Sequence, residues 1–366
     1  MTPGEPPASQ QPPAPRRRGR TLVIAGERIR PGQTRELQLR FGATYLGTPV
    51  SIPVYVMRAR ADGPRVFIMG VIHGDELNGI GIVRELLYDQ PPKLLKGTLV
   101  IIPVANIQGL ERHSRYMPDR RDLNRSFPGS PNGSLTRRLA HAIFTEIVAQ
   151  CDYGIDFHSA ALRRTNYPNV RASMRDAGTK RLAKAFGCEL IVSSKGPRGS
   201  LRYAAVEAGV PTIILEAGEV WKIEPRVVEI GVRGCLNALK DLGMIEGKPE
   251  PPSFQLTITK TLWVRSELGG LLGFHVRPGQ LVRKNQGLAT IYNIFGREQT
   301  SLLSPADGIV LGMTTMPMVN PGGVVYHLAA LSQRKFEETE RKMAVRAATS
   351  LYARIQDDLA TNITLR

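Results

Sequence analysis

Short apolar runs alternate with amphipathic segments along the middle of the chain, from residue 65 to residue 245. Short apolar runs between turn signals are typical of buried strands, and a helical period of apolar residues indicates helices. This alternation predicts an α/β fold with a mostly parallel or mixed sheet and helices on both faces. The expected strands span 21–26, 50–60, 65–72, 97–106, 152–160, 188–194 and 210–219, and the expected helices span 76–89, 135–150, 180–187, 202–209 and 225–243.

Changes in composition divide the 366 residues into four parts. Residues 1–20 are rich in proline and arginine and are expected to form a disordered tail without a signal peptide. The α/β domain is expected over 21–247, and a proline-rich linker follows it. Short alternating strands with Gly/Pro turns over 254–330 predict a smaller all-β domain, a barrel or sandwich. Residues 331–366 begin with a charged amphipathic helix, which is either solvated or packed against the domain or a second subunit.

The net charge of +17 favours an acidic partner: nucleic acid, anionic lipid or a carboxylate substrate. No nucleic-acid-binding signature occurs and aromatic residues make up only 6%, so nucleic acid ranks low and a small carboxylate-bearing substrate ranks higher. The sequence contains no stretch of about 18 apolar residues, so a membrane span is not expected. The three cysteines, Cys151, Cys188 and Cys235, are widely spaced, which indicates reduced thiols in a cytoplasmic protein.

Three of the expected strands end in ionisable residues. The apolar run RVFIMGVI stops at His73-Gly74-Asp75-Glu76, the strand containing DFH ends at His158, and Glu216 follows VPTIIL. In open α/β sheets, ligands bind at the carboxyl ends of the strands. A single HxxE pair arises often by chance, but polar clusters at three successive strand ends indicate one common site.

The residue types at these strand ends suit a metal. Two imidazoles and one carboxylate, with an open position for water, are a common catalytic zinc set, and a further carboxylate then serves as the general base. Asp156 and His158 share one face of their strand, so Asp156 is placed to orient the imidazole of His158.

The polar loop over 111–134 contributes arginines, most of which are expected to be solvated. Within it, DLNRSFPG places Asn124 beside Arg125, an amide and a guanidinium fork that suit a carboxylate. Arg202, at the start of an expected helix, is either a second clamp for a carboxylate or a surface arginine. The arginines of the loop are Arg112, Arg115, Arg120, Arg121 and Arg125.

The motifs HGDE, DLNR, DFH and LEAG, in this order, resemble those of the succinylglutamate desuccinylase/aspartoacylase family, a branch of the zinc carboxypeptidase fold. The resemblance covers about residues 45–330. It implies one Zn²⁺ per chain, Glu216 as the general base and acid, and Asn124 and Arg125 as contacts to the substrate carboxylate. The implied zinc ligands are His73, Glu76 and His158.

In the family an arginine upstream of the DLNR-like motif polarises the scissile carbonyl. Arg115 and Arg120 both compete for that role here, because the spacing is longer than in the aspartoacylase-type pattern. Arg115 is preferred, because it is followed by a tyrosine, as in the family.

The C-terminal segments 273–291 and 302–312 resemble the two halves of a biotinyl/lipoyl-type barrel. The stretch between them, YNIFGREQTS, has no lysine, so neither lipoyl nor biotin can be attached there. The barrel is therefore expected to be structural, a lid or wall over the zinc site. Tyr292 is expected in the core of the barrel rather than in the site.

Three functions compete on this basis. The first is a zinc-dependent deacylase that hydrolyses the amide of an N-acyl amino acid, and the second is a carboxypeptidase-like enzyme that trims peptides or glutamyl chains. A narrow, barrel-covered pocket favours the first, and an open groove favours the second. The third is a binding protein with a relic zinc site, against which the intact ligand set and Glu216 argue. A homo-oligomer is compatible with all three.

Overall fold

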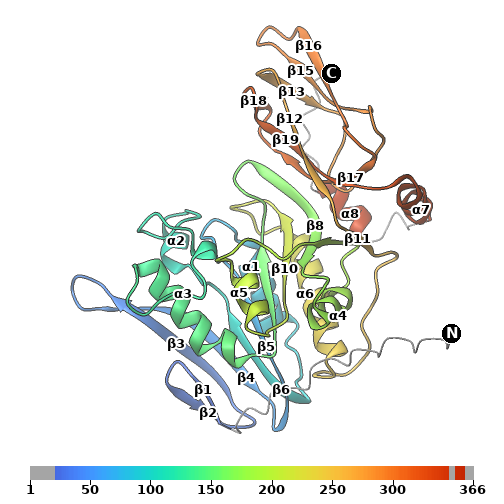
Figure 1. Ribbon diagram of the computed structural model, residues 1–366. Helices are drawn as coiled ribbons and strands as arrows, with labels where there is room; N and C mark the ends of the chain where they lie inside the picture. Colours follow the sequence, from blue (N-terminus) through green and yellow to red (C-terminus); the bar gives the residue numbers. More distant parts are fainter. Residues whose placement is uncertain (1–20, 346–350, 359–366) are drawn as a thin grey trace, which may run out of the picture.

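The computed structural model describes residues 21–345 and 351–358, and it shows an α/β domain with a second, all-β domain beside it (Figure 1). Residues 1–20, where a disordered tail is expected, lie outside the described part. The strands of the α/β domain are β1 (Leu22–Ile24), β2 (Glu27–Ile29), β3 (Thr34–Ala43), β4 (Pro49–Arg58), β5 (Ala61–Met69), β6 (Lys96–Ile102), β7 (Tyr153–His158), β8 (Arg164–Ala172), β9 (Leu190–Ser193) and β10 (Thr212–Gly218).

The helices of the α/β domain lie between these strands. They are α1 (Asn78–Arg84, continued by a π-helical turn, Glu85–Asp89), α2 (Ile107–Glu111), α3 (Leu135–Glu146), α4 (Ala177–Phe186), α5 (Leu201–Glu207) and α6 (Pro225–Asp241), with short 3-10 turns at Leu123–Arg125 and Val148–Gln150. Helix α3 begins where the side chain of Ser134 accepts a hydrogen bond from the amide of Arg137, which satisfies a free N–H of the first turn.

The central sheet is mixed, as the sequence predicts. Strands β6, β5, β7 and β10 lie side by side and run parallel, while β4 pairs antiparallel with β6 and β8 pairs antiparallel with β10. Helical crossovers between parallel strands bring their carboxyl ends to one edge of the sheet. That edge carries the residues of the site.

Alternate residues of the central strands build two separate hydrophobic cores. On β5, Val66 and Ile68 pack with α1, α4 and α6, whereas Phe67 and Met69 pack with α3, α5 and the β1–β2 hairpin. Since successive side chains of a strand point to opposite faces, helices must cover both faces of the sheet. All four residues are fully buried, which fixes β5, and with it the start of the HGDE turn.

Two long strands, β3 and β8, lie where the sequence predicts no element. Strand β8 reads RTNYPNVRA, in which polar residues and a proline hide the apolar alternation. It is nevertheless held on both sides, by β10 and by β17 of the second domain. Tertiary pairing therefore overrides a weak local preference here.

The second domain is all-β, as expected, but its strands are not separate from the central sheet. Strand β17 pairs antiparallel with β8, so that β12, β19 and β17 extend the sheet, while β16, β15, β13 and β18 form a sheet of their own. The strands are β11 (Leu256–Ile258), β12 (Thr261–Arg265), β13 (Gly270–Phe274), β14 (Leu281–Val282), β15 (Gly287–Tyr292), β16 (Glu298–Leu303), β17 (Gly308–Thr314), β18 (Met318–Val319) and β19 (Val324–Ala330).

The C-terminal region is described as two helices, α7 (Gln333–Ala344) and α8 (Leu351–Asp358), and residues 346–350 lie outside the described part. Helix α8 packs on the α/β domain: Tyr352 and Ile355 are buried in its core, and the Tyr352 hydroxyl donates to the carbonyl of Gly187. Of the two expectations for this region, packing against the domain therefore holds for α8.

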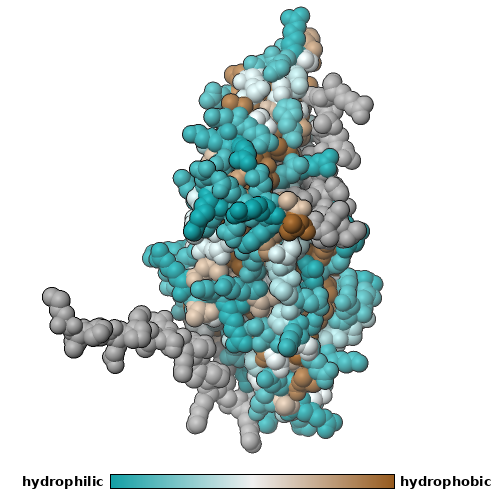
Figure 2. Space-filling view, turned by 90° about the vertical axis from the view of Figure 1, so that its right-hand side faces the viewer, coloured by the Kyte–Doolittle hydropathy of each residue, from teal (hydrophilic) through white to brown (hydrophobic). Residues whose placement is uncertain are grey.

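The surface seen in Figure 2 is mostly hydrophilic, with small scattered apolar patches. Within the described part of the chain, none of the helices combines the length and apolar character needed to cross a bilayer. Cys151, Cys188 and Cys235 are all buried and free.

Candidate active site

Three neighbouring strands deliver the ionisable residues to one place. His73 follows the end of β5, His158 is the last residue of β7, and Glu216 lies in β10 directly opposite His158 in the parallel register. The turn after β5 requires glycine at position 74, because a Cβ there would lie 2.0 Å from the backbone of Gly109. Glycine at this position thus lets helix α2 pack directly against the turn between His73 and Glu76.

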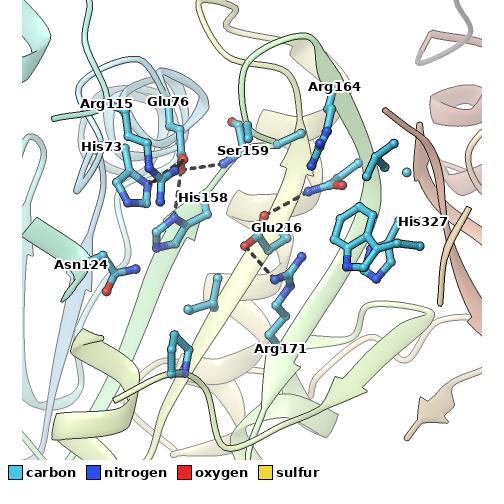
Figure 3. Close-up of a pocket in the computed structure, with 18 of the residues that line it drawn as sticks. His73, Glu76, Arg115, Asn124, His158, Ser159, Arg164, Arg171, Glu216 and His327 are labelled. Atoms are coloured by element: carbon cyan, nitrogen blue, oxygen red, sulfur yellow. Dashed lines mark hydrogen bonds and ion pairs between the residues drawn. The ribbon is translucent and has the colours of Figure 1, made fainter. Parts of the chain in front are cut away.

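His73, Glu76 and His158 form a compact and buried cluster (Figure 3). One ligand atom from each lies within 4.8 Å of the others. His73 Nδ1 is 2.6 Å from Glu76 Oε1, and His158 Nδ1 is 2.9 Å from Glu76 Oε2. Both imidazoles thus turn the same nitrogen to one carboxylate, an arrangement that fits a divalent cation bound by two nitrogens and an oxygen.

A carboxylate holds the other nitrogen of each imidazole. Asp156 Oδ2 lies 2.9 Å from His158 Nε2, where the sequence places an orienting carboxylate. Asp122 Oδ1 lies 3.2 Å from His73 Nε2, a contact that the sequence analysis missed. Such partners fix the ring and its tautomer in metal sites. Asp122 is the first residue of the DLNR motif, and this position in the sequence could have indicated its role.

Electrostatics keeps Glu76 ionised. Burial alone would raise the pKa of Glu76, but the charges of His73 and His158 outweigh burial and lower it well below its usual range. Burial lowers the pKa of His158, yet Asp156 and Glu76 raise it overall, well above the usual value. A cation would replace the protons on these nitrogens, because ligating imidazoles must be neutral.

Arg115 reaches the cluster from the polar loop. It donates from Nη1 to Glu76 Oε1 at 3.3 Å and from Nη2 to Asp122 Oδ2 at 2.9 Å. It lines the cavity next to His73, whereas Arg120, the competing residue, is not among the lining residues. Arg112 and Arg121 do not line this cavity either.

Asn124, Arg125 and Arg202 also line the cavity. Asn124 accepts the amide of Leu201 at 2.9 Å through Oδ1, and Arg125 donates from Nη1 to the carbonyl of Asn124 at 2.7 Å. Arg202 is only 3% exposed, so its reading as a surface arginine is wrong. Burial, together with the charge of Arg171, lowers the pKa of Arg202 to about 10.

Strand β8, which the sequence does not predict, supplies the contacts of Glu216. Asn166 donates from Nδ2 to Glu216 Oε2 at 3.0 Å, and Arg171 Nη1 lies 3.5 Å from Glu216 Oε1 (Figure 3). Both oxygens of this carboxylate are therefore held, on the side away from the His73–Glu76–His158 cluster. No sequence motif indicates that Asn166 or Arg171 belongs to the site, because the hydrophobic pattern of this segment does not predict strand β8.

The all-β domain closes one end of the cavity. Trp263 and His327 are cross-strand partners on β12 and β19, and their rings stack at 3.9 Å between centroids. The Arg164 guanidinium lies over the Trp263 ring at 5.2 Å from its centroid. Tyr292 does not line the cavity, but it is only partly buried and is not part of the barrel core, so its expected place in that core is wrong. The domain therefore forms a wall of the site.

The cavity measures about 260 Å³ and is partly open to solvent. It is lined by residues of both domains, with five arginines and two carboxylates, Glu76 and Glu216. Cavities of this order suit small ligands with a few placed polar groups. The fold and the site together define an α/β protein with a candidate metal centre in a small polar cavity.

Comparison with known proteins agrees with this class. Residues 62–242 match the family model described as succinylglutamate desuccinylase/aspartoacylase catalytic domain. The N-alpha-acetyl-L-2,4-diaminobutyric acid deacetylase of Halomonas elongata is 29% identical over 294 residues, covering 76% of this chain and 86% of that protein. The α/β domain of this chain belongs to the succinylglutamate desuccinylase/aspartoacylase family, whose members are hydrolytic deacylases.

Solved structures show the same fold. A succinylglutamate desuccinylase/aspartoacylase from Rhodobacter sphaeroides is 27% identical with a TM-score of 0.70, over 81% of this chain and 95% of that one. The product-bound ectoine utilization protein EutE (DoeB) of Ruegeria pomeroyi is 25% identical with a TM-score of 0.73, over 83% and 97%. Both comparisons extend beyond the family model into the C-terminal region.

Proposed function

We propose that this protein is a zinc-dependent hydrolase that cleaves the amide bond of an N-acyl amino acid or a similar carboxylate-bearing compound. The observation that carries the proposal is the His73–Glu76–His158 cluster, with its ligand atoms within 4.8 Å of one another, in one cavity with Glu216. The deacetylase activity named for the Halomonas elongata relative supports the same reaction class.

The donor set suits zinc. His73, Glu76 and His158 would hold one ion per chain, with Asp122 and Asp156 fixing the two imidazoles. The chemistry that zinc supplies in such sites is acidification of water and polarisation of a carbonyl.

Glu216 is placed to move the proton. Its carboxylate would accept the proton of the attacking water and deliver it to the nitrogen of the leaving amine. Asn166 and Arg171 hold its two oxygens, so the carboxylate keeps one orientation through both transfers. The parallel register between Glu216 and His158 keeps this base next to the cluster.

Arginines and an amide would position the substrate. Arg115, beside Glu76, would stabilise negative charge that develops on the carbonyl oxygen. Asn124 and Arg125, together with the buried Arg202, would hold a carboxylate and so place the amide over the cluster. The Oδ1 of Asn124 is already engaged with the amide of Leu201, which leaves its NH₂ group to donate to a ligand.

The carboxypeptidase-like alternative fits the cavity less well. A space of about 260 Å³, closed at one end by Trp263 and His327, matches an acyl amino acid better than an extended peptide. The walled shape therefore favours small N-acyl amino acids.

Hydrolysis assays test the proposal directly. The purified chain is stripped with a chelator, reloaded with Zn²⁺ and offered N-acetyl, N-succinyl and glutamyl amino acids. Amine release that disappears with the chelator and returns with zinc supports the proposal. Full turnover in the stripped protein, or release from the glutamyl amino acids alone, would reject it.

A further inference from the structure

Asn78 lies two residues after Glu76, at the start of helix α1, and is only 1% exposed. Its Nδ2 donates to the hydroxyl of Ser159 at 3.0 Å and to Oε2 of Glu224 at 3.1 Å. Its Oδ1 accepts the backbone amide of Glu224 at 2.8 Å. One buried side chain that follows β5 therefore contacts both the segment that follows β7 and the segment that follows β10.

Glu224 occupies the position just before helix α6, where an acidic side chain commonly caps its own helix. Among the described residues, its carboxylate accepts no hydrogen bond from the first turn of α6. Instead, Oε2 accepts the backbone amide of Glu219 at 2.8 Å, in addition to the amide of Asn78. Burial raises the pKa of Glu224, because the carboxylate has lost part of its contact with water. This buried group therefore holds the turn after β10 rather than its own helix.

The turn after β10 is shaped to receive this carboxylate. Gly218, the last residue of β10, has a φ of +69°, a conformation that favours glycine. A Cβ at this position would lie 1.9 Å from Oε2 of Glu224, so the space is already taken by the carboxylate. The carbonyl oxygens of Ala217 and Glu219 lie 3.5 and 3.4 Å from Nδ2 of Asn78. The chain is thus held on both sides of the glycine.

Regular pairing of β10 stops at Glu216. The parallel register with β7 ends with the pair of Glu216 and His158, and the antiparallel register with β8 shifts between Glu216 and Gly218. Asn166 and Arg171 hold the oxygens of the Glu216 side chain, but both come from β8. Contacts from outside the two ladders are therefore needed to fix the backbone that follows Glu216.

The same network continues to the candidate metal cluster. The backbone amide of Ser159, whose hydroxyl accepts from Asn78, donates to Oε2 of Glu76 at 3.0 Å (Figure 3). The amide of the next residue, Ala160, donates to the carbonyl of Gly218 at 3.1 Å. The strand end that carries Glu216 is thus tied to the cluster by a continuous set of buried hydrogen bonds.

We propose that Asn78 and Glu224 are positioning residues of the proposed hydrolase, which hold the end of β10 so that the carboxylate of Glu216 keeps its place beside the cluster. This inference rests on the proposed function and adds the support of its general base. Neither Asn78 nor Glu224 is among the residues that line the cavity, so both act through Glu216. A base must lie within hydrogen-bond reach of the proton that it takes, and a misplacement of about 1 Å costs about a hundredfold in rate.

The acceptor oxygen of Glu224 can be removed while the length of the side chain is kept. Both hydrogen bonds end on the same oxygen, so Glu224→Gln retains an acceptor for both, whereas Glu224→Met has none. For each folded, zinc-loaded chain we expect kcat of Glu224→Met to fall about tenfold to a hundredfold, with KM near that of the unmodified protein. Glu224→Gln should keep most of kcat, and Glu224→Ala repeats the test if Glu224→Met folds poorly. Equal kcat values in Glu224→Gln and in the variant without the acceptor would overturn the inference.

Controls separate positioning from a general loss of stability. Denaturant unfolding and elemental analysis give the folded and zinc-loaded fractions to which kcat is referred. Glu229→Met removes a carboxylate of the same helix α6 outside the cavity and should leave kcat unchanged.

A double variant tests whether the effect passes through Glu216. If Glu224 acts only by placing Glu216, then adding Glu224→Met to Glu216→Ala should cause no further loss of kcat. Asn78→Ala, which removes both donors of the network, should behave in the same way. Losses that multiply in the double variants would overturn the inference.

The position of Glu216 is also measured apart from turnover, by crystal structures of the unmodified chain, Glu224→Gln and Glu224→Met. We expect the carboxylate of Glu216 to shift by about 1 Å relative to His158 in Glu224→Met and to stay in place in Glu224→Gln. An unmoved Glu216 in Glu224→Met would overturn the inference, even in a chain that hydrolyses every compound. A shifted Glu216, in a protein whose unmodified form hydrolyses none of the compounds, contradicts the proposed function and keeps the positioning role.

Discussion

The two ends of the cavity are built from different kinds of residues. The metal end consists of buried carboxylates and imidazoles at the carboxyl ends of parallel strands, and every imidazole nitrogen there faces a carboxylate. The barrel end consists of partly exposed arginines and an aromatic stack on antiparallel strands of two domains. The metal end is His73, Glu76, Asp122, Asp156 and His158, and the barrel end is Arg164, Arg171, Trp263 and His327.

We therefore expect the metal end to determine whether a substrate reacts and the barrel end to determine which substrate is preferred. At the metal end Glu76 and all four imidazole nitrogens already have partners, so the geometry is preorganised for a cation. At the barrel end the Nε of Arg171 is buried without an acceptor among the described residues, which leaves a donor for a substrate group or for water. Substitutions at the metal end should abolish turnover, whereas substitutions at the barrel end should change which substrate is preferred.

The largest effect is expected at Glu216. In Glu216→Ala the proton carrier is gone while the candidate metal ligands remain, so kcat should fall about 10²- to 10⁴-fold with zinc retained. Steady-state kinetics and elemental analysis check both parts. Glu207→Ala, which removes an exposed carboxylate paired with Lys195, should leave kcat near that of the unmodified protein. Wild-type turnover in Glu216→Ala would show that another group carries the proton.

A smaller effect is expected at Arg125, on the polar loop beside the metal end. Arg125→Ala removes charge-assisted hydrogen bonds to the substrate carboxylate, so kcat/KM should fall roughly 10- to 100-fold on N-acyl amino acids. The same variant should lose little on amides that have no free carboxylate. Arg121→Ala, an exposed neighbour on the same loop, is the control. Equal losses on both kinds of substrate would contradict the role of Arg125 as a clamp.

The smallest effect concerns His327 at the barrel end. Burial and the charges of Arg171 and Arg164 lower the pKa of His327 to about 4, against the ordinary value of 6.5 for histidine. Between these values the unfolded chain binds more protons, so stability falls as the pH drops from 6.5 towards 4, by about 2 kcal/mol between pH 7 and pH 5.

Unfolding by denaturant at several pH values measures this effect, as the difference between the unmodified protein and His327→Gln, which cancels the titration of all other groups. Between pH 7 and pH 5 the unmodified protein should lose about 2 kcal/mol more of its free energy of unfolding than His327→Gln loses. Parallel profiles would mean that His327 is not shielded from protons by the two arginines.

The metal end could be predicted from the sequence, and the barrel end could not. His73, His158 and Glu216 each follow an apolar strand, and strand order then places them at one edge. Asp122 escaped notice because its contact with His73 spans 49 positions and comes from a loop. Its position at the start of the DLNR motif was the one local feature that could have indicated a role in the site.

The barrel end depends on pairing between distant strands. Arg164, Asn166 and Arg171 lie on β8, whose local pattern is too polar to indicate a strand and which is held in place by β10 and β17. Trp263 and His327 meet only because β12 and β19 pair across 64 positions of the chain. Periodicity describes one element at a time, so contacts of this kind leave no trace in it.

The most direct test of the account is the metal content of the purified chain. We predict about one zinc per chain by elemental analysis. His158→Ala should lose the ion, and His141→Ala, a histidine of α3 outside the cavity, should keep it. A chain without zinc after reconstitution, or a His158→Ala variant that binds zinc as tightly as the unmodified protein, would contradict the account.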